Sequence, residues 1–180
     1  MKKNYLLLII LFAFSCAKAQ NEIESNPYQK NNDITINAIA AFNESLNISY
    51  ERHLNAKSSI GIYYYQVLTT DTSNDMNYSV SPYYRRYFGK KYASGWFAEG
   101  FGMLTSIDGK KVYTSENPST YTENSDVIDF ALGVNGGWKW VSKSGFLLEA
   151  NIGYGALLFN ANKTDHNMVM KFGLSAGYRF

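Results

Sequence analysis

The sequence predicts an all-β fold, an eight-stranded antiparallel up-and-down transmembrane β-barrel. Three stretches, 127–141, 146–158 and 168–180, alternate between large apolar side chains and Gly, Ser, Asn or charged ones. Because successive strand side chains point to opposite faces, each stretch predicts a strand with one apolar face. The 15 Tyr, 11 Phe and 3 Trp favour strands with aromatic belts. After the first twenty residues, no apolar run approaches the roughly 20 residues of a spanning helix, whereas a tilted spanning strand needs about 9–11.

The apolar faces of these three strands are expected to point outward, into lipid. They comprise alternate residues from Ile128 to Trp140, from Phe146 to Leu158 and from Met168 to Phe180. The opposite faces are small and polar, which suits a narrow polar lumen. A water-soluble barrel also alternates, but it places its large residues inside. The orientation of these rows therefore decides between a membrane barrel and a soluble one.

Residues 1–19 have the pattern of a secretory signal peptide. A basic start at Met1–Lys3 precedes an apolar stretch at Tyr5–Phe14 and an A-x-A cleavage site ahead of Gln20. An alternative is a lipoprotein site in which Cys16, the only cysteine, is lipidated. A disordered lead-in at 20–32 and a barrel domain at 33–180 complete the predicted organisation.

Five further strands precede the three described above. They are predicted over about Asp33–Phe42, Leu46–Leu54, Ser59–Thr69, Tyr78–Gly89 and Gly95–Ser106. The phase of the third and fifth strands is ambiguous, and the better choice has Ile60 outward and Glu99 in the lumen. Arg86 falls on the outward face of the fourth strand, where it is expected to snorkel to the interface. Pro82 cannot donate to the strand ladder and predicts a bulge or a strand end.

The predicted connections alternate in length. Those after the second, fourth and sixth strands are short, whereas longer polar loops follow the third, fifth and seventh, at Thr70–Asn77, Ile107–Asp126 and Asn160–Asn167. Short periplasmic turns and longer external loops are typical of bacterial outer-membrane barrels. This topology predicts an aromatic girdle at the periplasmic rim, made of Phe88, Trp96, Trp138, Trp140, Phe146, Tyr178 and Phe180.

The alternation also places eight charged side chains in the lumen. The acids are Glu51, Glu99, Asp129 and Glu149, and the bases are Arg85, Lys139, Lys171 and Arg179. An eight-stranded barrel is just wide enough inside for side chains to fill. Because unpaired buried charges are costly, we expect the two sets to pair across the lumen and plug it. The alternative role for these groups is a narrow proton or ion path.

Several short motifs resemble a known family. The chain ends in Gly177-Tyr178-Arg179-Phe180, similar to the C-terminal signal by which outer-membrane proteins are recognised for insertion. The stretches ISYERHL from Ile48, PYYRRYFG from Pro82, GWFAEGFG from Gly95, and 136–155 together resemble a family of small bacterial outer-membrane β-barrel proteins of unknown function. The resemblance implies an eight-stranded barrel, with recognition by the barrel-assembly machinery through Phe180, and brings no established activity.

Candidates for catalysis or metal binding are few. His53 and His166 are the only histidines and lie at opposite ends of the predicted barrel, so no metal, cofactor or catalytic residue is predicted. A lipid-modifying hydrolase, similar to a lipid A deacylase, would have to use His166 with Asp165 and a loop hydroxyl. The loop residues Tyr113 and Tyr121 are candidate anchors for a partner.

The function predicted from the sequence is that of a non-enzymatic, structural or adhesive barrel in the outer membrane of a Gram-negative bacterium. Its partners would be outer-membrane lipid and, at the external loops, a protein or glycan ligand. A net charge of +2 with scattered Lys and Arg argues against nucleic acid. Two alternatives stay open, the lipid hydrolase and a lipid-anchored periplasmic barrel similar in outline to a lipocalin.

Overall fold

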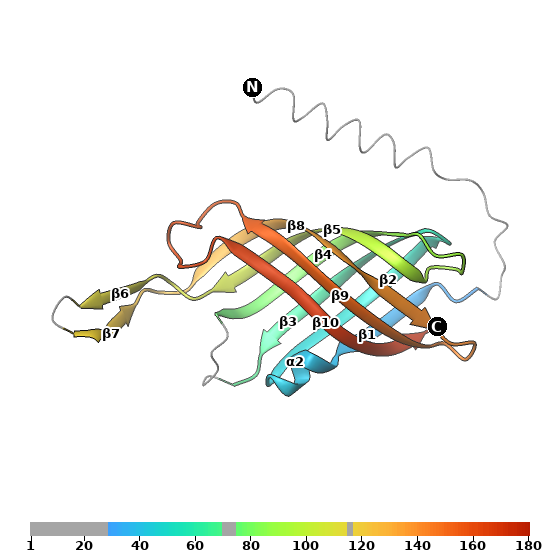
Figure 1. The fold of residues 1–180 in the computed structure, drawn as a ribbon, viewed down its shortest axis with the longest axis horizontal. Coiled ribbons are helices and arrows are strands. Elements are labelled where there is room, and N and C mark those ends of the chain that lie inside the picture. The colour runs from blue at the N-terminus through green and yellow to red at the C-terminus, as the bar shows by residue number, and fades with distance from the viewer. Residues whose placement is uncertain (1–28, 70–74, 115–116) are drawn as a thin grey trace, which may run out of the picture.

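The computed structural model describes residues 29–69, 75–114 and 117–180, which form a closed antiparallel barrel with one projecting hairpin (Figure 1). The predicted signal peptide, Cys16 and most of the predicted lead-in lie outside the described residues. The barrel strands are β1 (Asn32–Asn37), β2 (Ser45–Asn55), β3 (Ser58–Val67), β4 (Met76–Tyr87), β5 (Gly95–Ile107), β8 (Val127–Val141), β9 (Phe146–Leu157) and β10 (Met168–Arg179). The predicted eight-stranded all-β fold is confirmed.

The barrel closes by pairing its first strand with its last. The strand order is β1-β10-β9-β8-β5-β4-β3-β2, and the seam places Asp33 opposite Arg179. One end carries the short turns and the end of β10, and we call it the turn end. At the opposite, loop end, the hairpin between β5 and β8 projects away from the barrel (Figure 1).

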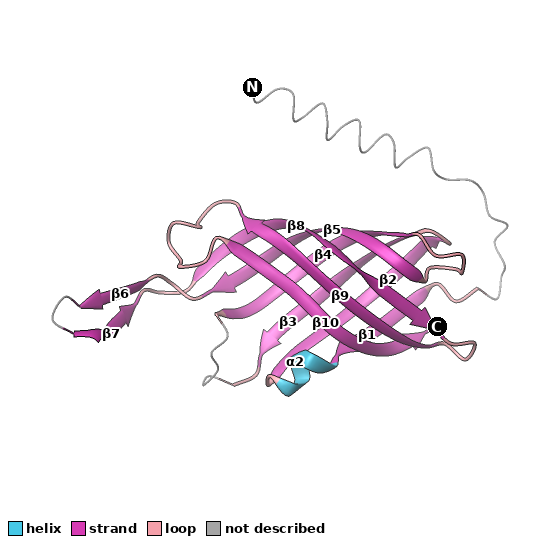
Figure 2. Ribbon diagram, in the orientation of Figure 1, coloured by secondary structure: helices cyan, strands magenta, loops and turns pink. Residues whose placement is uncertain are grey.

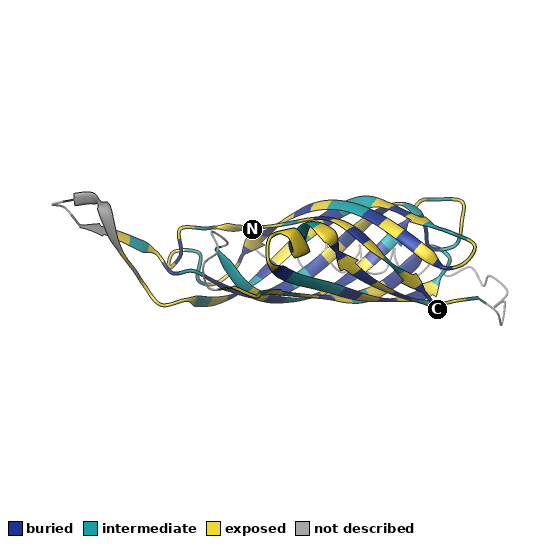
Figure 3. Ribbon diagram, turned by 90° about the horizontal axis from the view of Figure 1, so that it is seen from below, coloured by how far each residue is buried: buried dark blue, intermediate teal, exposed yellow. Residues whose placement is uncertain are grey.

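The barrel strands alternate between buried and exposed residues, as Figure 3 shows along each ribbon. On β8, Val134 is 70% exposed whereas Lys139 is 1% exposed. The alternate residues from Phe146 to Leu158 and from Met168 to Phe180 also point outward, and all of them are exposed except Ala150, which is partly buried. The predicted outward orientation of the apolar rows is therefore confirmed, which is the arrangement typical of a barrel surrounded by lipid.

The ambiguous phases of the third and fifth predicted strands are settled in the same way. Ile60 and Ile62 point outward on β3, while Phe97, Glu99 and Phe101 are buried inside on β5. The inward-facing rings on β5 are accommodated because neighbouring strands present small residues to the lumen, such as Gly133 and Gly137 on β8. An added Cβ would lie 2.4 Å from Phe101 at Gly133 and 2.6 Å from Phe97 at Gly137.

The first predicted strand, Asp33–Phe42, is wrong over its second half. It ends at Asn37, and a short helix, α2 (Ala38–Phe42), follows (Figure 2). The Asn37 side-chain oxygen accepts hydrogen bonds from the backbone N–H groups of Ile39 and Ala40, at 3.0 and 3.4 Å. This is an N-cap, which favours a helix over a continued strand, and alanine is the best helix former.

Two smaller predictions are also corrected. The register of β4 against β5 does not shift at Pro82, since Val80 pairs with Leu104 and Tyr83 with Phe101, so no bulge forms there. The predicted irregular loop Ile107–Asp126 contains a hairpin of β6 (Lys111–Thr114) and β7 (Asn117–Glu123). Within the described residues, no helix is long and apolar enough to cross a membrane.

Candidate functional site

The lumen near the turn end is filled by an ion network, and Arg85 lies at its centre. Its guanidinium contacts carboxylates from three other strands, at 2.8 Å for Glu51, 2.8 Å for Glu99 and 2.7 Å for Glu149. The Arg85 side chain is fully buried, and its Cζ lies 3.8 Å from the centre of the Phe97 ring. Alternation along β4 directs Arg85 inward, and its length lets it span the narrow lumen.

Lys139 on β8, two strands away from β4, extends this network. Its ammonium lies 2.7 Å from Glu51, 3.0 Å from Asp33 and 3.2 Å from Glu149. Asp33 in turn accepts hydrogen bonds from Arg179 at 2.7 and 2.9 Å. Charged groups from β1, β2, β4, β5, β8, β9 and β10 thus meet in one interior cluster, which satisfies the expectation that buried charges are paired.

Three tyrosines complete the hydrogen bonding of the network. The Tyr87 hydroxyl donates to Glu51 at 2.5 Å, Tyr83 donates to the same carboxylate at 3.2 Å, and Arg85 donates to the Tyr63 hydroxyl at 2.6 Å. Each ring is buried, so its apolar part packs inside the lumen while its hydroxyl group makes a hydrogen bond. The network therefore fills the lumen near the turn end with buried, paired side chains.

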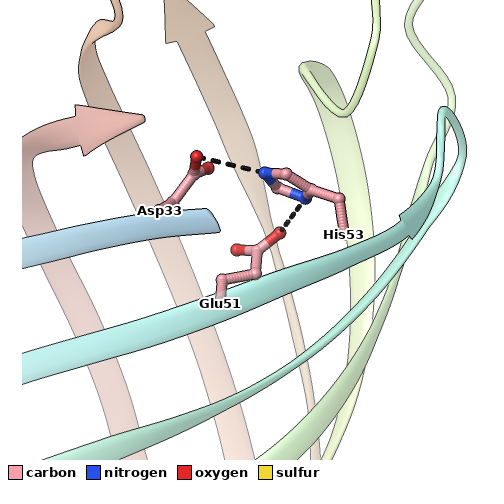
Figure 4. A group of neighbouring side chains, drawn as sticks. All are labelled: Asp33, Glu51 and His53. Atoms are coloured by element: carbon pink, nitrogen blue, oxygen red, sulfur yellow. Dashed lines mark ion pairs between the residues drawn. The ribbon is translucent and has the colours of Figure 1, made fainter. Parts of the chain in front are cut away.

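His53 lies at the edge of the network, between two acids (Figure 4). One ring nitrogen is 3.1 Å from Asp33 and the other is 3.4 Å from Glu51. The three side chains bring ligand-type atoms within 4.8 Å of one another. However, Lys139 already contacts both acids and Arg179 contacts Asp33, so the negative charge that a metal cation would need is already paired. Both ring nitrogens of His53 are buried and make no hydrogen bond.

The connection between β4 and β5 closes the turn end. Arg179 donates to the carbonyls of Tyr92 and Ala93, at 3.0 and 2.8 Å, which draws this turn across the mouth of the lumen. Ala93 is fully buried and has φ 38°, and its N–H bonds to Ala56 O at 2.9 Å. Burial raises the pKa of the Tyr92 phenol, whose hydroxyl donates to Asn31 at 2.7 Å.

The structure brings together seven of the eight charges that the sequence placed in the lumen. Lys171 joins through Glu99, at 3.0 Å. Asp129 is inward and buried but lies apart, because its carboxylate accepts backbone N–H groups from Phe130, Phe159 and Asn160 at 2.7 to 3.1 Å. It holds the loop after β9 rather than pairing with a base.

Sequence reasoning missed Asp33 and His53 as members of the network. The signal for Asp33 was present, because Ile34 and Ile36 outward require Asp33 inward at a two-residue period. His53 was placed in the lumen by the same period, but its two acidic neighbours come from the barrel register, which matches Asp33 with Glu51.

All seven residues of the predicted aromatic girdle are exposed, from Trp140 at 40% to Trp96 at 69%. Five of them lie on β5, β8, β9 and β10 beside the turn end, while Phe88 directly follows β4 and Phe180 directly follows β10. Trp96 is directly opposite Trp138 in the register. Aromatic side chains gathered at one end of a barrel are favoured at a lipid–water boundary.

His166, the candidate base of a hydrolase, has different neighbours from those predicted. Its ring lies 3.3 Å from Asp75, while the Asp165 carboxylate accepts the backbone N–H of Lys111 at 2.9 Å. Among the described residues, no serine or threonine hydroxyl bonds to the His166 ring; Thr164 instead accepts its backbone N–H at 3.2 Å. The predicted pairing of His166 with Asp165 is not formed in this arrangement.

The comparison with protein families decides the classification. A profile of the family DUF3575, described as a protein of unknown function, matches residues 6–176. The chain belongs to this family. The resemblance to a barrel family of unknown function, inferred from short motifs, is thereby confirmed, and the DUF3575 description adds no activity.

The fold of this DUF3575 protein is similar to that of a solved barrel domain. The N-terminal β-barrel domain of Pseudomonas aeruginosa OprF aligns with a TM-score of 0.57 at 13% identity, over 84% of this chain and 98% of that one. The Yersinia pestis outer membrane protein Ail aligns with a TM-score of 0.43 at 17% identity, over 84% and 100%. No curated protein matches the sequence.

Proposed function

We propose that this protein is a non-conducting outer-membrane barrel whose work is structural or adhesive and is carried out at its loop end. The observation that carries the proposal is the combination of an apolar outer wall with a sealed lumen. A soluble lipocalin-like barrel would need the reverse arrangement, with its large apolar side chains inside.

The aromatic girdle and the C-terminus support a defined orientation in the membrane. The exposed rings at the turn end would lie at the periplasmic boundary, which leaves the loop end outside the cell. Phe180, a girdle residue that is 51% exposed, is the residue that the barrel-assembly machinery would recognise. The signal peptide expected at 1–19 would deliver the chain to that machinery.

The hairpin formed by β6 and β7 is the best-placed element for binding an extracellular protein or glycan. It projects from the loop end (Figure 1), and it connects to the rest of the molecule through bonds near its base, from Lys110 N to Lys163 O at 3.0 Å and from Lys111 N to Asp165 at 2.9 Å. Because these bonds hold the hairpin at its base, the rest of the hairpin would be presented to a partner.

Location is tested by fractionating cells that express the full chain. The protein is expected in the outer-membrane fraction, resistant to carbonate and soluble in detergent. Mature protein that remains in solution without detergent would contradict the proposal and restore the soluble-barrel alternative.

Adhesion is tested with a variant in which 109–125 is replaced by a short Asn-Gly turn. Cells carrying this variant are expected to lose attachment to immobilised host-surface proteins or glycans, while the barrel remains folded. If cells that express the intact barrel attach no better than cells that lack it, the adhesive role is contradicted and the structural role remains. A matched control exchanges exposed Lys163 for Ser outside the hairpin.

A further inference from the structure

The barrel wall has a gap in its loop-end half. β10 pairs with β9 from Met168 onward, but it pairs with β1 only from Ser175 to Arg179. Within the described part of the chain, Met168–Leu174 therefore has a strand partner on one side only. The chain leaves the wall at Asn37 and continues as α2, which contacts both β10 and β2 across this gap (Figure 2).

A cavity of about 320 Å³ lies beside the gap. Its lining includes Val169 and Lys171, which face the lumen, and also Met168 and Met170, which face outward on the same strand. A cavity lined by both faces of one strand reaches the edge of that strand. The loop-end lumen is thus connected to the outer surface of the barrel at the position of α2.

The cavity lining combines flexible apolar side chains with polar ones. Beyond Met1, the chain has four methionines, and all of them line the cavity, namely Met76, Met103, Met168 and Met170. Methionine adapts to apolar ligands of irregular shape. Polar side chains on β2 and β4, including Asn47, Ser79 and Ser81, also line it, and the Ser81 hydroxyl is buried without a hydrogen-bond partner. Asp75 and His166 line it too and contact each other at 3.3 Å. The ammonium of Lys171 is already paired with Glu99.

We propose that this cavity binds one fatty-acyl chain of a membrane lipid, which enters sideways between α2 and β10, and that Ser81 bonds to a hydroxyl or amide group on it. The proposal rests on the membrane location proposed above. A volume of this size is in the range of small-molecule sites. A peptide strand fits less well, because the Asn37 amide already bonds to the Phe172 carbonyl at 3.1 Å and α2 covers the edge to which a strand would pair.

The test uses the full mature protein in phospholipid vesicles that contain palmitic acid with a photoreactive diazirine near its chain end. Flotation with the vesicles is scored first, because failure to float contradicts the membrane location itself. In floated protein, irradiation and peptide mapping are expected to place label on luminal Met103 or Val169. Label confined to outward residues such as Leu104 would overturn the acyl site alone.

A matched pair of variants completes the test. Met103→Trp fills the cavity and is expected to reduce luminal labelling about tenfold, whereas Leu104→Trp, on the outer face of the same strand, is expected to leave it unchanged. Unchanged labelling in a folded Met103→Trp protein would overturn the proposal. If that variant does not fold, Val169→Trp replaces it with the same expected results. Luminal labelling by an aqueous diazirine-octanoate, but not by the membrane probe, would also overturn it.

Discussion

Arg85 contacts three carboxylates at once, from β2, β5 and β9. Removal of one member of a buried ion pair leaves uncompensated charge in a low-dielectric interior. We expect Arg85→Met to lower the free energy of unfolding by about 3–5 kcal/mol. Urea unfolding of the vesicle-inserted barrel, followed by tryptophan fluorescence, measures this change.

Arg86 supplies the control for this prediction. It is the next residue on β4, but it points outward and is only partly buried. Arg86→Met is expected to change the free energy of unfolding by no more than about 0.5 kcal/mol, as for most surface substitutions. If the two variants lost the same free energy of unfolding, the interior network would not be the source of the stability that Arg85 contributes.

At the level of single residues, the sequence predicted which side chains enter the lumen but not what they bind. A two-residue period was sufficient for Arg85, Lys139 and Glu149. The contact between Arg85 and Glu149 joins non-adjacent strands across the lumen, so it depends on barrel closure and side-chain length. Asp129 has the same inward phase, yet its carboxylate accepts hydrogen bonds from backbone N–H groups of a neighbouring loop. A two-residue period shows that a side chain points inward, but it does not show which groups that side chain contacts.

Among the elements, α2 depends most on one side chain. Asn37 ends β1, caps α2 through its oxygen and bonds to β10 through its amide. Asn37→Ala is expected to destabilise the protein by about 1 kcal/mol, the usual cost of losing an N-cap. It should also speed amide hydrogen exchange in Ile39 and Ala40, which mass spectrometry or NMR measures.

Asn37→Asp separates the two roles of this residue. The carboxylate keeps the capping oxygen but loses the amide donor to Phe172, so exchange in α2 should stay slow. Gly173 offers an independent check, because an added Cβ would lie 2.5 Å from the Asn37 amide nitrogen. Gly173→Ala is therefore expected to displace Asn37 and to resemble Asn37→Ala; normal exchange rates in α2 would contradict this role.

The elements also show where sequence patterns lose information. The stretch AIAAF after Asn37 continues the apolar alternation of β1 loosely, and five residues are too few to display a helical period. The sequence of the β6–β7 hairpin is polar and shows no apolar alternation. Its two strands pair with each other in a sheet separate from the barrel, so a two-residue apolar pattern does not reveal them.

The same hairpin provides a prediction about stability. Since β5 and β8 pair directly from Gly95–Lys139 to Ile107–Val127, the hairpin contributes no strand to the barrel wall. Replacement of 109–125 by a short turn is expected to leave the urea midpoint of the barrel nearly unchanged. A large drop would mean that the hairpin supports the wall, and would weaken its assignment as a binding element.

For the whole molecule, the filled lumen predicts that the barrel does not conduct ions. The interior network and the turn held by Arg179 fill the turn-end half of the barrel. Planar bilayers containing the purified protein should show no steps of conductance above the lipid baseline. Steady channels from folded wild-type protein would contradict the non-conducting role and favour the ion-path alternative for the lumen charges.

The seam between β1 and β10 has a consequence for biogenesis. Asp33 lies on β1, the first barrel strand, and its partner Arg179 lies on β10, the last barrel strand. The same arginine donates to the turn between β4 and β5. Both contacts therefore have to wait until the last strand has been made and paired with the first, so the seam and the turn end are completed in one late step of barrel assembly.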